Sequence, residues 1–142
     1  MHPIKKYHEL VKTKNIDIYD EILDEDVVFY SPVFHTPQKG KEITKLYLTA
    51  AGGVFNTKAS GQMSDNSRPS SSEFRYIKEV IGKRDAFLEF ETSIQGIYIN
   101  GIDLITWNEE NKIIEFKVLI RPLQAVNMLH KMMGSMLEKL NK

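Results

Sequence analysis

The sequence contains no cysteine, so it can form neither disulfide bonds nor a thiolate nucleophile. Its 19 basic and 19 acidic residues cancel, and no basic stripe supports nucleic-acid binding. No apolar run approaches the roughly 18 residues of a membrane helix, and the first residues, MHPIKKYHELVK, lack a signal-peptide core. These absences predict a cytoplasmic protein that binds neither nucleic acid nor a membrane.

Signatures of cofactors and metal ions are also missing from the sequence. Its four histidines have no paired spacing of the kind that metal ligands need. There is no glycine-rich phosphate loop, nucleotide fingerprint or catalytic triad in a recognisable context. We therefore expect no cofactor and no metal site. A length of 142 residues is enough for one core and one domain, spanning residues 1–142.

The most informative stretch is residues 97–122, which reads as two β-strands joined by a polar turn at 108–111. In the second strand Ile114, Phe116, Val118 and Ile120 alternate with polar residues, so they are expected on one face. The first strand carries one residue that is unusual in such a pattern, Asp103. Its environment depends on how the two strands pair.

Two registers of this hairpin are compatible with the local sequence. One places Asp103 opposite Lys117, on the polar face, where the two would form a surface ion pair. The other, with a loop over Asn108–Asn111, places it opposite Phe116, where the carboxyl group would be buried. Asn111 tolerates the left-handed conformation that either loop requires, so the turn does not decide between them.

The rest of the chain predicts helices followed by strands and a closing helix. Residues 56–72 are polar and of low complexity, which predicts a mobile flap or partly disordered insert. Helices on one face of a sheet define an α+β fold. We expect a curved antiparallel sheet wrapped around the N-terminal helices, with a cavity at its open end. The predicted elements are helices at 3–13, after 17, from 40 and after 122, and strands at 27–30, 74–81, 86–94 and in the hairpin.

Three stretches resemble the nuclear-transport-factor-2-like (NTF2-like) superfamily, in its ketosteroid-isomerase-like and SnoaL-like branch. GIDLITWNEENKIIEFKVLI is similar to the isomerase hairpin, DEDVVFYSPVF to the family's first strand and following loop, and KYHELVKTKNIDIYDEIL to its two opening helices. The resemblance extends over most of the chain. It implies a cone-shaped α+β barrel, and it selects the register that buries Asp103 beside Phe116.

The resemblance also implies roles for three residues. Asp103 corresponds to the protonated aspartate of the isomerase oxyanion hole, and Tyr7 to its hydrogen-bonding tyrosine. Ser31 takes the position of the catalytic base, although serine is not a base. His35, in the following loop, is the nearest alternative base. A buried carboxyl group among apolar side chains should have a raised pKa and could donate a hydrogen bond when neutral, as the corresponding aspartate does in ketosteroid isomerases.

Two functions follow from this site. The first is binding of a small hydrophobic molecule, with Tyr7 and Asp103 as polar anchors. The second is a cofactor-free isomerase or cyclase that stabilises an enolate with the same two residues. The hairpin's outer face, with Ile102, Leu104 and Leu119, suggests a homodimer, as many family members form. The residues expected to line the ligand site are Tyr30, Ser31, Tyr47, Phe90, Ile105, Trp107, Phe116 and Val118.

Overall fold

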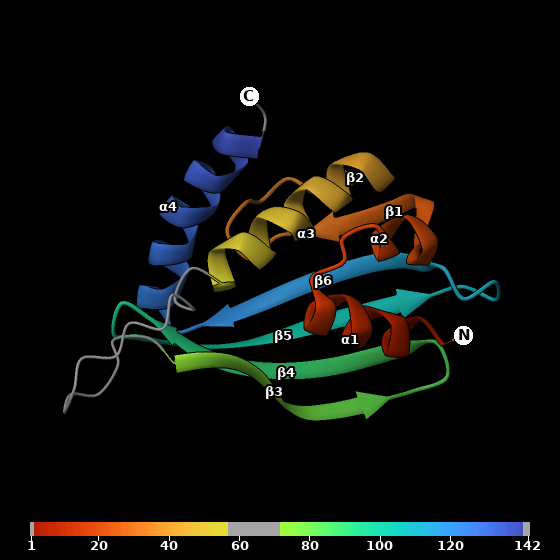
Figure 1. The fold of residues 1–142 in the computed structure, drawn as a ribbon, viewed down its shortest axis with the longest axis horizontal. Coiled ribbons are helices and arrows are strands. Elements are labelled where there is room, and N and C mark those ends of the chain that lie inside the picture. The colour runs from red at the N-terminus through yellow and green to blue at the C-terminus, as the bar shows by residue number, and fades with distance from the viewer. Residues whose placement is uncertain (1, 57–71, 141–142) are drawn as a thin grey trace.

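The computed structural model describes residues 2–56 and 72–140. Most of the low-complexity segment predicted at 56–72 therefore lies outside the described residues. The described residues form an open, curved sheet with helices packed against one of its faces (Figure 1). The predicted α+β class is confirmed. Four helices are described: α1 (Pro3–Thr13), α2 (Ile18–Ile22), α3 (Lys41–Asn56) and α4 (Leu123–Leu140).

Local sequence signals explain where the helices begin and which faces they bury. Pro3 occupies the first turn of α1, where a missing backbone N–H costs nothing, and the Nδ1 atom of His2 accepts a hydrogen bond from the N–H of Ile4. Tyr7 and Leu10 follow at helical spacing and are buried. Asp17 precedes α2, but its side chain makes no capping hydrogen bond.

The sheet has six strands in the order β2-β1-β6-β5-β4-β3. It is mixed rather than fully antiparallel as predicted, because β1 and β6 run parallel. A parallel pair needs a long connection, and here α3, β3, β4 and β5 all lie between the two strands in the chain. The strands are β1 (Leu23–Tyr30), β2 (Gln38–Lys39), β3 (Ser72–Ile81), β4 (Asp85–Ile94), β5 (Ile97–Trp107) and β6 (Ile113–Arg121).

The register of the β5–β6 hairpin differs from both sequence-based alternatives. Asp103 pairs with Val118, two positions beyond the predicted Phe116 and therefore on the same, inward face. The strands pair from Trp107 and Ile113, so the loop includes one residue more than predicted. In addition, Ile114 has no partner in β5, forming a bulge. The bulge turns Ile114 outward, where it is exposed, whereas the sequence pattern placed it on the inward face.

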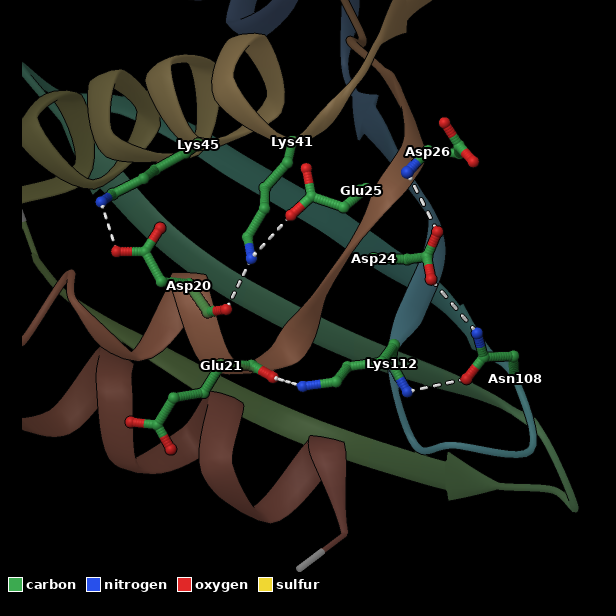
Figure 2. Close-up of polar contacts among 9 residues, drawn as sticks. All are labelled: Asp20, Glu21, Asp24, Glu25, Asp26, Lys41, Lys45, Asn108 and Lys112. Carbon is green, nitrogen blue, oxygen red and sulfur yellow. Dashed lines mark hydrogen bonds and ion pairs between the residues drawn. The ribbon is translucent and has the colours of Figure 1, made fainter.

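Polar contacts hold the end of this hairpin against α2 and β1 (Figure 2). Within the loop, the Oδ1 atom of Asn108 accepts hydrogen bonds from the backbone N–H groups of Glu110 and Lys112, which extends the turn to Lys112. The Nζ atom of Lys112 donates to the carbonyl oxygen of Glu21, and the amide of Asn108 donates to Asp24. The turn sequence alone does not determine the length of this loop, and contacts to α2 and β1 help to fix it.

The buried side chains form two apolar clusters on the helix-covered face of the sheet. The first joins α1, α2 and β1 to the parts of β5 and β6 near their connecting loop. The second joins α3 and α4 to β4 and the beginning of β5. Within the described residues, no helix is long and apolar enough to cross a membrane.

Candidate functional site

A cavity of about 240 Å³ opens between the helices and the concave face of the sheet. Its walls come from both apolar clusters and are largely hydrocarbon. Aromatic rings form much of the surface, which is the composition expected of a small-molecule site. The aromatic residues that line it are Tyr7, Tyr19, Phe29, Phe55, Phe74, Tyr76, Phe90 and Phe116.

One polar cluster interrupts this apolar wall. The hydroxyl of Tyr76 donates a hydrogen bond of 2.7 Å to the Oδ2 atom of Asp103, and the hydroxyl of Tyr7 lies 3.3 Å from the same oxygen. The two hydroxyl oxygens are 3.0 Å apart. The three residues come from β3, β5 and α1, so the tertiary fold assembles the cluster from segments that are distant in sequence.

Burial is the main influence on the pKa of Asp103, which is only 5% exposed. Removal of the carboxylate from water raises its pKa from 3.8 to about 6, because the charged form loses more solvation than the neutral form. The hydrogen bonds from Tyr76 and Tyr7, and the nearby His8, oppose this increase. Asp103 therefore titrates closer to neutral pH than an exposed aspartate does, and a carboxyl group perturbed in this way inside a cavity is a candidate functional residue.

The phenols of the cluster are held in their neutral form. Burial, and then the nearby Asp103, raise the pKa values of Tyr7 and Tyr76 well above their usual range. Tyr19, which also lines the cavity, has a raised pKa for the same two reasons. Each hydroxyl thus keeps its single proton. Tyr76 and Tyr7 direct theirs to Asp103, so each can donate to a ligand oxygen only by giving up that bond, whereas its oxygen can accept from a ligand hydroxyl.

Six of the residues singled out from the sequence line the cavity. Tyr7 and Asp103 belong to the polar cluster, whereas Phe90, Phe116 and Val118 contribute apolar wall. Ser31 also lines the cavity. Its Oγ atom accepts hydrogen bonds from the backbone N–H groups of Val33 and Phe34, at 3.1 and 3.3 Å. These bonds shape the loop after β1.

The other expected residues lie elsewhere. His35 is exposed and is not part of the cavity wall, so the structure does not bring it to Asp103. Tyr47 is absent from the wall too and packs against Phe29 and Phe34. Tyr30 has Lys117 over its ring, also away from the cavity. Ile105 and Trp107 are buried in the first apolar cluster, without reaching the cavity.

Sequence reasoning missed Tyr76, which makes the shortest hydrogen bond to Asp103. Period-two alternation in β3 places Tyr76 on the same face as Phe74, which was a usable signal. What the alternation could not reveal is the pairing of Tyr76 with Phe90 and the irregularity that follows it. The ring of Phe74 lies 5.1 Å from that of Tyr76 and 4.8 Å from that of Phe90, so neighbouring aromatic rings support the phenol.

The described residues contain no group of three or more histidine, aspartate or glutamate side chains that could hold a metal ion. The polar residues that line the cavity are instead tyrosines, Ser31, Thr49, one aspartate and one lysine. Such a set binds oxygen-containing groups by hydrogen bonding.

Comparison with known proteins places this architecture. The structure resembles a steroid delta-isomerase from Pseudomonas aeruginosa with a TM-score of 0.81 and 22% identity, over 97% of this chain and 90% of that one. It resembles an NTF2-like protein of unknown function from Mesorhizobium loti with a TM-score of 0.64 and 11% identity, over 84% and 88% of the two chains. The chain has the NTF2-like fold. The resemblance proposed from the sequence is thus confirmed for the fold, which a SnoaL-like family protein from Agrobacterium tumefaciens also shares.

A further structural neighbour has a higher sequence identity. An uncharacterized protein with a cystatin-like fold from Silicibacter pomeroyi is 29% identical, with a TM-score of 0.77, over 95% of this chain and 85% of that one. No protein-family model matches the sequence, and the search of curated proteins finds no match. The NTF2-like fold hosts different activities, so function has to be argued from the site.

Proposed function

We propose that the protein binds a small, largely apolar molecule through a hydroxyl or carbonyl oxygen. The observation that carries this proposal is the position of the Asp103–Tyr7–Tyr76 cluster on the wall of an otherwise apolar cavity. Apolar walls contribute to the affinity for a ligand but do not orient it, whereas a few buried polar groups determine the orientation of the ligand in the cavity. A ligand hydroxyl at this cluster would donate to the carboxylate of Asp103, and a ligand carbonyl oxygen would accept from a phenol that turns its proton from Asp103 to the ligand.

Binding is better supported than catalysis, although the same groups could stabilise an enolate. An isomerase or cyclase would also need a base within hydrogen-bond reach of the carbon-bound proton. Ser31 has no suitable pKa, and His35 does not line the cavity. Among the described residues of the wall, Asp103 is the only carboxyl group, and it is already engaged with both phenols. Catalysis remains the second candidate because these donors are in place.

Titration of the protein with fluorescent naphthols tests the binding proposal. Asp103→Leu should weaken binding by about 1–2 kcal/mol, roughly five- to thirtyfold, because the hydrogen bond to the ligand oxygen is lost. Asp103→Asn should retain most of the affinity, since an amide can still donate. Tyr76→Phe should also weaken binding.

Tyr30→Phe is the matched control, because it removes a phenol hydroxyl that lies outside the cavity. Its affinity should equal that of the unaltered protein. Equal affinities for the unaltered protein, Asp103→Leu and Tyr76→Phe would show that the cluster does not contact the ligand and would refute the proposal.

We further propose that two copies of the chain associate through the outer face of β4, β5 and β6. None of the described helices covers this face, where Leu119 is 46% exposed and Tyr98 45%. Leu119 pairs with Ile102 across the strands, which makes an apolar centre. Acidic and basic side chains, among them Glu115 and Lys117, lie on the same face. A surface with both signs of charge can match itself across a twofold axis.

Leu119→Lys should convert the dimer into a monomer, because two ammonium groups would be desolvated at its centre. Leu123→Lys is the control, since Leu123 is 73% exposed but belongs to α4 rather than to this face. Light scattering at micromolar concentration would measure both masses. A monomeric unaltered protein would rule out the proposed dimer.

A further inference from the structure

One face of α1 forms a stripe along the cavity. Tyr7, Leu10, Val11 and Lys14 all line it, at spacings of three and four residues. The stripe begins at the Asp103–Tyr7–Tyr76 cluster and continues over apolar side chains to a basic residue. With a rise of 1.5 Å per residue, the backbones of Tyr7 and Lys14 lie about 10 Å apart along the helix.

The backbone fixes Lys14 in this position. Lys14 caps the end of α1 with a left-handed φ of 61°, and its N–H donates a 2.7 Å hydrogen bond to the carbonyl oxygen of Leu10. Such a cap terminates the helix and turns the chain. Lys14 and, after the turn, Ile16 both line the cavity while being exposed to solvent, so they lie at its open side.

Among the described residues Lys14 has no carboxylate partner, which is also true of Lys5 and Lys12 in α1; what distinguishes Lys14 from them is its place on the cavity wall. By contrast, Lys6 of α1 pairs with Glu21, and Lys45 of α3 pairs with Asp20. Lys14 is also the only basic residue among the described residues of the cavity wall. An unpaired ammonium group beside an apolar cavity is available to an anionic ligand group.

We propose that the ligand is an amphipathic carboxylate. Its apolar body fills the cavity, its hydroxyl or carbonyl oxygen contacts the Asp103–Tyr7–Tyr76 cluster, and its carboxylate pairs with Lys14 at the other end of the α1 stripe. This inference rests on the proposed binding function and narrows it to a chemical class: rigid hydroxy or keto acids that carry the oxygen and the carboxylate at opposite ends of an apolar body.

A lysine at a helix end can also act only on the helix, since a positive charge favours the C-terminal carbonyl groups. Lys12 separates the two roles. It lies in the last turn of α1, as Lys14 does at its cap, but it does not line the cavity. Lys12→Gln therefore reproduces the loss of a charge at this helix end without changing the cavity.

The test compares 6-hydroxy-2-naphthoic acid with its methyl ester, which share a shape and a hydroxyl group but differ in charge. At pH 7 and low salt, the unaltered protein should bind the acid about three- to fivefold more tightly than the ester, as expected for a partly exposed ion pair. Lys14→Gln should abolish this preference with little change in ester affinity, and Lys14→Glu should reverse it. Lys12→Gln should retain it.

The outcomes distinguish the inference from the function on which it rests. The carboxylate proposal would be overturned if the unaltered protein binds acid and ester equally, or if Lys14→Gln keeps the preference for the acid. The proposed binding function would still stand in either case, provided that Asp103→Leu weakens ester binding. Absence of binding by both compounds would overturn the proposed function as well. A preference lost in both Lys12→Gln and Lys14→Gln would indicate a general effect of charge and also refute the role of Lys14.

Discussion

The stability of the Asp103→Asn variant should gain on that of the unaltered protein as the pH rises. The difference between their free energies of unfolding should shift by about 2 kcal/mol in favour of the variant between pH 4 and pH 7. In the unfolded chain Asp103 ionises near its ordinary pKa of 3.8, whereas burial raises the pKa in the folded protein to about 6. Between these values the unfolded state releases the proton first. The contribution of Asp103 to stability is therefore fully present below pH 3.8 and is lost as the pH rises through 6.

The measurement is the free energy of unfolding in urea at several pH values for both proteins. The difference between them isolates residue 103, because asparagine does not titrate while the other groups are common to both. Asp17→Asn is the control, since Asp17 is exposed and makes no capping hydrogen bond; its stability should follow that of the unaltered protein. A constant difference for Asp103→Asn from pH 4 to pH 7 would show that Tyr7 and Tyr76 compensate fully for burial.

Replacing Gly101 with alanine should destabilise the protein by about 2–3 kcal/mol. Gly101 faces inward on β5, two residues before Asp103, and a Cβ atom there would lie 2.3 Å from the Cζ atom of Phe90 and 2.7 Å from the Cδ1 atom of Ile120. Phe90 cannot move freely, because the rings of Phe55 and Phe74 pack against it. Overpacking at this position should therefore displace several side chains.

The matched control is Gly134→Ala, in α4. A Cβ atom at Gly134 would meet nothing within 4 Å, and alanine favours a helix over glycine, so this variant should be stabilised by up to about 1 kcal/mol. Thermal and urea unfolding would compare the two. Unchanged stability of Gly101→Ala would show that Phe90 and Ile120 can move aside, and naphthol binding would then reveal whether the cavity wall has moved with Phe90.

The sequence was sufficient for the parts of this protein that depend on local patterns. Alternation from Phe116 to Ile120 and the apolar spacing in α1 are properties of consecutive residues, so they predicted the second strand of the hairpin and the inward position of Tyr7. The resemblance of the hairpin selected the face of Asp103, and the structure buries it on that face, opposite Val118 instead of Phe116.

Only the tertiary structure decided which residues meet. The bulge at Ile114 and the extended loop shift the pairing of the whole hairpin, and the contacts that support the loop reach Glu21 and Asp24, more than 80 residues away. The contact between Tyr76 and Asp103 joins strands that are not neighbours in the sheet, since β4 lies between them. Sheet curvature brings such groups together, and no spacing in the sequence encodes it. The tertiary structure also decides that His35 lies outside the cavity and that Lys14 lines it.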